Sequence, residues 1–230
     1  YAAMPAVLKD AIERSYQKAG WDLRNSESEK GVFPTFFDLL DILPGVIEES
    51  HYSKDTQSDY VGALCTRVKS LTNGIYGSVF CAEDALSDAE LFDCNVVVDL
   101  SRVGSMETKS LLMGILVMKL QEYRMCGSEM NSRLRHVTVL EEAHNLLRKT
   151  SAEQSQEGAN LQGKSVEMLA NAIAEMRTYG EGFIIADQAP GLLDMSVIRN
   201  TNTKIILRLP DEEDRKLVGK SAGLKEAQID

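Results

Sequence analysis

The chain has 230 residues, 43% of them hydrophobic, and its 25 lysines and arginines against 35 aspartates and glutamates give a formal net charge of −10. An apolar fraction of this size can bury the core of one large domain or two small ones. The longest apolar run, Leu111 to Met118, is far shorter than the roughly 20 residues that cross a bilayer, so we expect a cytoplasmic protein with no integral membrane segment. The acidic balance argues against coating nucleic acid with a uniformly basic surface, and the cysteine and histidine spacing does not suit a structural zinc site.

The first part of the chain, residues 1–90, is predicted to be mostly helical. Apolar residues recur with helical spacing over residues 5–18. The segment Pro34-Thr35-Phe36-Phe37-Asp38 carries the cap residue and the N3 carboxylate of a capping box, so a second helix should start there and kink or end at Pro44. A third helix is expected over residues 58–71, where Asn73-Gly74 closes it.

The second part, residues 91–230, changes character. Helical segments of ten or more residues separate four short apolar runs that are rich in β-branched residues, namely 94–100, 136–140, 182–186 and 203–209. Continuous apolar strands that alternate with helices predict an α/β fold with a mainly parallel sheet covered by helices on both faces. The helix expected over residues 105–126 is apolar nearly all round, so we expect it to be deeply buried.

The most informative segment is the apolar strand Val137 to Leu140 followed by Glu141 and Glu142. Two acids at the end of such a strand lie at the carboxyl edge of a parallel sheet, where open α/β folds bind ligands. In phosphoryl transfer, Glu141 could hold a hydrated Mg²⁺ and Glu142 could polarise the attacking water. The alternative is structural, because both acids would also stabilise the first turn of a helix over residues 143–148.

A second group of polar residues follows the next strand. The segment Glu175-Met176-Arg177-Thr178-Tyr179-Gly180 precedes the apolar strand Phe183 to Ala186, and Asp187-Gln188-Ala189-Pro190 comes directly after it. A glutamine at the end of this strand, Gln188, could donate a hydrogen bond to a γ-phosphate or accept one from the attacking water. By itself, such a residue is more often an ordinary polar residue of a loop.

Taken in order, these motifs resemble a known family. EEAH after an apolar strand, EMRTYG, an apolar strand ending in DQAP, and IRNTNTKIILRL are similar to the C-terminal half of the ATPase domain in the HerA/FtsK superfamily, above all in HerA-like DNA translocases and conjugative-transfer ATPases. The weaker upstream segments AIERSYQKAGWDL, PTFFDLL and VVVDLSRV resemble the stretch that precedes the acid pair in that family. The resemblance implies a RecA-like P-loop NTPase sheet, of which residues 91–230 would be the C-terminal half.

The resemblance also implies an activity and roles for individual residues. Such proteins are hexameric motors that hydrolyse ATP with Mg²⁺ to move DNA, so a homo-hexamer, DNA and a nuclease or secretion partner are the expected partners. Glu141 and Glu142 would be the Walker B acids, with Glu141 holding Mg²⁺ through water, and Gln188 would sense the nucleotide. Arg177 is the first candidate and Arg208 the second for an arginine that reaches the ATP of a neighbouring subunit. The alternative for each arginine is a surface ion pair.

The sequence contains a formal phosphate-loop match that we do not expect to function. Gly158 to Ser165 satisfies GxxxxGK[ST], but the residues before it are polar and cannot form the buried strand that a phosphate loop requires. Residues 148–163 are predicted to be a flexible loop instead, with a helix following over residues 165–178. In related motors the phosphate loop lies upstream of the acids, so we expect this chain to begin after it, to lack the Walker A segment, and to bind ATP weakly or not at all by itself.

Three other interpretations of the chain's function remain open. The chain could be a non-catalytic regulatory or oligomerisation module that keeps the fold, or part of an ATPase that powers protein or DNA secretion. The EEAH string is also typical of DEAH-type helicases, but Asp187-Gln188 stands where the Ser-Ala-Thr element of those helicases would be.

Overall fold

The computed structural model describes residues 4–82, 85–127, 129–149 and 156–229, with the backbone alone for residues 156–164. The chain divides into two compact units, Tyr1–Ala85 and Leu86–Asp230, close to the boundary expected at residue 90. Each unit has its own apolar core. None of the described helices is long and apolar enough to span a membrane.

The first unit is helical apart from a short antiparallel pair of two-residue strands. Its elements are α1 (Met4–Lys18), β1 (Trp21–Asp22), β2 (Glu27–Ser28), α2 (Phe36–Glu49), α3 (Lys54–Tyr60), the π-helical turn η1 (Val61–Cys65), α4 (Thr66–Thr72) and α5 (Gly74–Phe80). Its core forms where α1 packs on α2 and α2 packs on η1 and α4, with Ala11, Leu43 and Ile47 fully buried.

The predicted capping box at the start of α2 is confirmed. The Thr35 side chain accepts a hydrogen bond from the Phe37 backbone N–H, and the Asp38 carboxylate accepts one from the Thr35 backbone N–H at 2.7 Å. This backbone hydrogen bond lowers the pKa of Asp38. The helix does not end at Pro44, because buried residues on both sides of the proline, Leu43 and Val46, keep the segment packed on the core.

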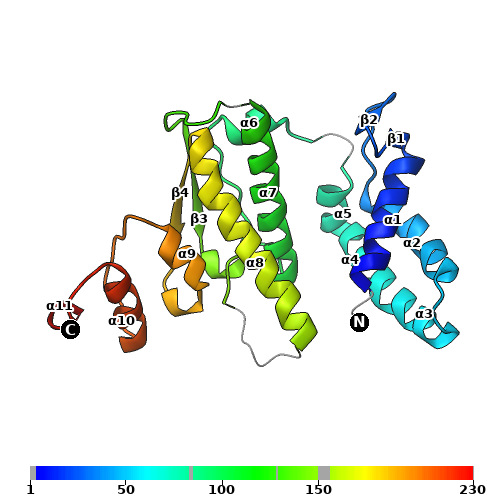
Figure 1. Ribbon diagram of the computed structural model, residues 1–230. Helices are drawn as coiled ribbons and strands as arrows, with labels where there is room; N and C mark the ends of the chain where they lie inside the picture. The colour runs from blue at the N-terminus through cyan, green and yellow to red at the C-terminus, as the bar shows by residue number, and fades with distance from the viewer. Residues whose placement is uncertain (1–3, 83–84, 128, 150–155, 230) are drawn as a thin grey trace. The chain divides into compact units, whose positions relative to one another are not determined.

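The second unit contains a parallel pair of strands with helices packed beside it (Figure 1). Its elements are α6 (Asp88–Phe92), α7 (Met106–Gly127), β3 (His136–Glu141), η2 (Ala143–Asn145), α8 (Gln156–Met176), η3 (Arg177–Tyr179), β4 (Glu181–Ala186), η4 (Pro190–Leu192), α9 (Met195–Asn200), α10 (Glu212–Ser221) and α11 (Glu226–Ile229). Helices α7 and α8 pack against each other, and Leu120, Leu147 and Met176 lie at the centre of the core. The predicted strands at 136–140 and 182–186 are confirmed as β3 and β4, paired from His136 with Glu181 to Glu141 with Ala186.

The other two predicted strands are wrong for this structure. Residues 94–100 and 203–209 have no regular secondary structure and pair with no strand in the described part of the chain. Their apolar side chains are largely exposed, for example Val97 at 93% and Ile205 at 89%. Branched apolar residues favour extended backbone, but a strand also needs a neighbour that accepts and donates the ladder hydrogen bonds.

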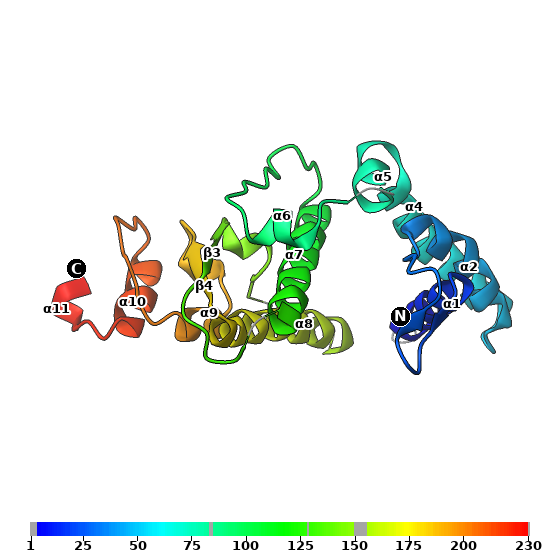
Figure 2. The same cartoon turned by 90° about the horizontal axis from the view of Figure 1, so that it is seen from above.

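In the described residues the two-stranded sheet has one covered and one open face, and the larger sheet with helices on both faces stays a prediction. Leu140 is buried on the covered face, whereas Val137, Val139 and Ile184 are 40%, 55% and 54% exposed. We call these three residues the open face. Helix α7 is buried along one stripe only rather than all round. It packs against α8 (Figure 2), α6 and η2, and Ile115 on its other side is 39% exposed.

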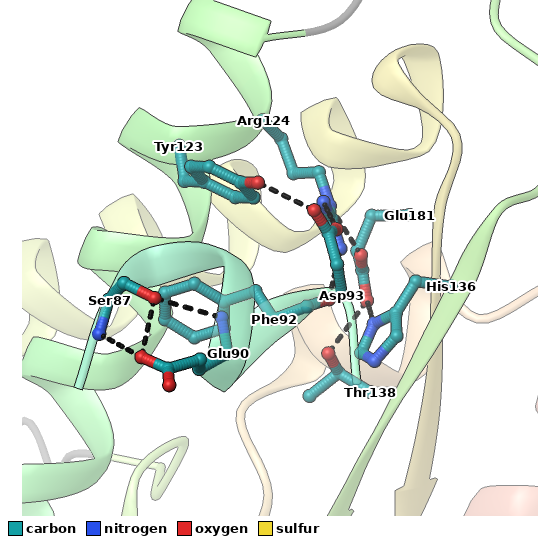
Figure 3. Close-up of polar contacts among 9 residues, drawn as sticks. All are labelled: Ser87, Glu90, Phe92, Asp93, Tyr123, Arg124, His136, Thr138 and Glu181. Atoms are coloured by element: carbon teal, nitrogen blue, oxygen red, sulfur yellow. Dashed lines mark hydrogen bonds and ion pairs between the residues drawn. The ribbon is translucent and has the colours of Figure 1, made fainter. Parts of the chain in front are cut away.

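A buried polar network holds α6 and α7 to the amino ends of β3 and β4 (Figure 3). The Glu181 carboxylate has no exposed surface. It accepts hydrogen bonds from Arg124 Nε at 2.9 Å, His136 Nδ1 at 2.8 Å and Thr138 Oγ1 at 2.7 Å. The same guanidinium donates to Asp93 Oδ1 and to the Phe92 carbonyl, both at 2.6 Å.

The network also perturbs the ionisation of its members. The pKa of Asp93 is lowered, first by the hydrogen bond from the Tyr123 hydroxyl and then by the one from Arg124. Burial lowers the pKa of Arg124, but its hydrogen bonds to Asp93 and Glu181 outweigh burial, and the pKa is raised. The charged forms of Asp93 and Arg124 are therefore the ones that this packing favours.

Candidate functional site

The carboxyl ends of β3 and β4 bring together the two polar groups that the sequence predicted. Because Glu141 pairs with Ala186, the next residues on the two strands emerge side by side. Glu142 adopts the left-handed conformation, with φ 50° and ψ 47°, where the chain leaves β3 and enters η2. An L-residue other than glycine rarely adopts this conformation, at a cost of roughly 1 kcal/mol or more, so the surrounding contacts must hold it.

Glu142 and Gln188 are in direct contact. The Gln188 amide Nε2 donates to Glu142 Oε1 at 3.1 Å and lies 3.4 Å from Oε2. Both side chains are exposed, so solvent and ligands can reach this pair. Glu142 precedes η2, but its side chain makes no capping hydrogen bond, so the alternative role as a helix cap is wrong for this residue.

Two further residues complete the cluster, and the sequence analysis assigned them no role. Asp187 Oδ2 accepts a hydrogen bond from the His144 backbone N–H at 2.8 Å and lies 2.9 Å from His144 Nδ1. Asp187 Oδ1 accepts from the Ala189 backbone N–H at 2.9 Å, and the carboxylate is 3% exposed. His144 Nδ1 is also 3.6 Å from Glu142 Oε2, so the acid lies between the imidazole and the Gln188 amide.

Glu141 lies at the end of β3 with an exposed side chain. Side chains alternate along a strand, which places Glu141 on the same side as Val137 and Val139 of the open face. In the described part of the chain, no group of three or more His, Cys, Asp or Glu residues has metal-binding geometry. Mg²⁺ usually keeps several waters and uses only one or two protein carboxylates with substrate phosphates, and a single exposed strand-end glutamate fits that chemistry.

The candidate arginines are not part of this cluster. Arg177 is exposed in η3, directly before the amino end of β4, whereas Glu142 and Gln188 follow the carboxyl ends. A six-residue strand is about 20 Å long, so Arg177 is at the opposite end of the sheet from the acids of its own chain. Arg208 is exposed in segment 203–209, which has no regular secondary structure, and it forms no ion pair with a described residue.

The segment that matches the phosphate-loop expression lies inside a helix. Residues 158–165 fall within α8, where backbone N–H groups bond to the carbonyls four residues earlier and cannot cradle a phosphate. The expected flexible loop over residues 148–163 is therefore wrong for 156–163, because glutamine, glutamate, alanine and leucine in this stretch favour helix. Residues 150–155 lie outside the described part of the chain, and Arg148 forms a β-bridge with Leu193.

The cluster has the parts of a water-activating site. A solvent-accessible carboxylate can accept a proton from water or orient it, an amide can donate or accept beside it, and a buried aspartate with a histidine fixes the geometry of the turn. Comparison of the chain with family models, with curated proteins and with solved structures found no match.

Proposed function

We propose that this chain is the C-terminal portion of a RecA-like ATPase domain in a hexameric motor that translocates DNA, of the HerA/FtsK type. The observation that carries the proposal is the contact of Glu142 with Gln188 at the carboxyl ends of two neighbouring parallel strands. A carboxylate beside an amide at this edge of an α/β sheet suits water activation next to a phosphate. The order of motifs EEAH and DQAP supports the same reading.

In this proposal the residues at the carboxyl ends of β3 and β4 have different roles. Glu142 accepts a proton from the attacking water or orients it, and Glu141 holds Mg²⁺ through a water molecule. ATP with Mg²⁺ supplies the phosphoryl group and the neutralising charge. Gln188 Nε2 carries two hydrogens, so it could donate one to Glu142 and the other to a γ-phosphate. That bridge would couple the nucleotide to the loop after β4.

The positions of the arginines restrict their role. Arg177 lies at the far end of the sheet from Glu142 of its own chain, so it could act only on the nucleotide of a neighbouring subunit. Arg208 is exposed and free of described ion pairs, and it remains the second candidate for this role. An arginine in either place would match the planar charge that develops on a transferring phosphoryl group.

The test is turnover by the longer protein that the proposal implies. Glu142→Gln preserves the size of the side chain but removes the carboxylate, so DNA-stimulated ATP hydrolysis should fall at least about 100-fold. Glu122→Gln is the matched control, because Glu122 is exposed on α7 near Arg124, which bonds to the amino end of β4, whereas Glu142 follows the carboxyl end of β3. Unchanged turnover in Glu142→Gln would refute the motor proposal and favour the regulatory or oligomerisation module.

A second measurement addresses the phosphate loop. With residues 158–165 in a helix, the 230-residue chain alone should show no micromolar binding of ATP by calorimetry. Micromolar binding that Lys164→Ala abolishes would show that this segment does form a phosphate site and would overturn the assignment of the cradle to another part of the protein.

A further inference from the structure

The contact between His144 and Asp187 fixes which ring nitrogen carries the hydrogen. Asp187 Oδ2 lies 2.9 Å from His144 Nδ1, and a carboxylate can only accept. Nδ1 must therefore be the protonated nitrogen, and in a neutral ring Nε2 then has a lone pair. Since the carboxylate is 3% exposed and accepts from two backbone N–H groups as well, its direction is fixed by three donor atoms from two different turns.

The pair joins the two turns that carry Glu142 and Gln188. His144 is two residues after Glu142, and Asp187 is the residue before Gln188. The left-handed backbone at Glu142 is costly, and its relaxation to an ordinary helical conformation would turn the side chain away from Gln188. The double attachment of His144 to Asp187, through the ring and through the backbone N–H, opposes that relaxation.

We propose that Asp187 and His144 are positioning residues, and that the Nδ1–H of His144 bonded to Asp187 holds Glu142 and Gln188 face to face. This inference rests on the function proposed above and deepens it, because it assigns to the same site the element that sets its geometry. The ring acts through Nδ1, and Nε2 has no required role.

Two substitutions at one position separate the two ring nitrogens. Asparagine places its amide nitrogen near the position of Nδ1, whereas glutamine places its amide nitrogen near that of Nε2. In the longer protein, His144→Asn should therefore retain turnover within about threefold, and His144→Gln should lose about 10–100-fold in kcat, the usual cost of losing an orienting partner. The KM for ATP should change little in either variant, since the pair does not contact the nucleotide.

The positioning claim also has a test that does not depend on activity. Long-range proton–nitrogen NMR on the 230-residue chain, at about pH 8.5 where free imidazole is neutral, should show His144 as the Nδ1–H tautomer. The His144→Gln spectrum identifies the signal, and exposed His51 is the internal reference. In Asp187→Asn, a nearly isosteric change, the tautomer should shift toward Nε2–H.

The outcomes are distinguishable. An Nε2–H tautomer in the unmodified chain, or one that Asp187→Asn leaves unchanged, overturns the inference. So does turnover that survives in His144→Gln and is lost in His144→Asn, because Nε2 would then be the working atom. Turnover that Glu142→Gln leaves intact refutes the proposed function instead, and the NMR result still decides whether the pair holds the two turns together.

Discussion

Removal of Arg124 is the most demanding test of the second unit. The side chain of Arg124 is 6% exposed and that of Glu181 is not exposed at all, so Arg124→Met would leave a buried carboxylate without its cation. Methionine retains most of the aliphatic stem, which limits the loss of packing. Breaking a buried pair in this way typically costs about 3–5 kcal/mol, compared with a total stability of about 5–15 kcal/mol for an ordinary domain.

A matched control lies on the same helix. Lys119 of α7 pairs with Asp88, but the two side chains are 41% and 36% exposed. Lys119→Met removes a cation and introduces the same residue, and an exposed pair contributes only about 0–1 kcal/mol. The difference between the two variants therefore measures the cost of losing the Arg124 contacts with Glu181, Asp93 and the Phe92 carbonyl, beyond the cost of losing an exposed cation on α7.

Urea unfolding at pH 7 measures both variants. Far-UV circular dichroism follows the helices of both units, whereas the only tryptophan, Trp21, lies in the first unit and reports on that unit alone. For a slope of about 2 kcal/mol/M, the midpoint of the second unit should fall by roughly 1.5–2.5 M in Arg124→Met, and the Trp21 transition should not move.

The result that would refute this reasoning is a loss in Arg124→Met that is within about 1 kcal/mol of the loss in Lys119→Met. A double variant gives an independent check. Adding Glu181→Gln to Arg124→Met removes the unpaired charge and keeps one acceptor oxygen for His136 and Thr138, which both bond to Oε1, so it should recover part of the lost stability.

Three further predictions concern stability. Glu142→Gly should be about 1 kcal/mol more stable than Glu142→Ala in urea unfolding, because glycine adopts the left-handed backbone without strain; equal stabilities would contradict the strain argument. Gly180→Ala should lower the free energy of unfolding by at least about 1–2 kcal/mol, because φ is 84° and a Cβ would lie 2.5 Å from the Arg133 carbonyl oxygen. Gly45→Ala is the control: the site lies in open space within α2, and the change should raise the free energy of unfolding by up to about 1 kcal/mol. Similar effects at the two glycines would contradict this argument. The pKa of Asp93 is lowered in the folded state, so its contribution to stability is complete above the unfolded pKa near 4 and is lost as the pH falls through the folded pKa. Asp93→Asn should therefore destabilise the protein at pH 7 and make its stability fall less steeply in acid. An unchanged dependence of stability on acid pH would contradict this prediction.

The parts of the fold that could be predicted are those that a short segment specifies by itself. Thr35 and Asp38 form the capping box within one helical turn, and the structure has both of its hydrogen bonds. The apolar runs that became β3 and β4 are each followed by polar residues at a strand end, and the order of the chain places them as neighbours. The Glu142–Gln188 contact follows from that pairing.

The features that could not be predicted depend on a partner elsewhere in space. Residues 94–100 have the composition of a strand, but the composition does not say whether another strand offers a free edge. The same holds for residues 203–209. His144 and Asp187 lie within the motifs EEAH and DQAP, and the strand register could have identified their contact. Pairing Glu141 with Ala186 brings Asp187 next to the turn that contains His144.

The open face has a practical consequence for solution behaviour. Val137, Val139 and Ile184 expose apolar surface on the open face, and Val97 and Ile205 are exposed in segments that have no regular secondary structure. Extended β-branched runs of low charge are the composition from which intermolecular sheets grow. The net charge of −10 opposes such association at neutral pH, and acidification or high salt weakens that repulsion. Purification and storage at neutral pH, low salt and low protein concentration should therefore keep the chain monodisperse, and light scattering should increase first on acidification.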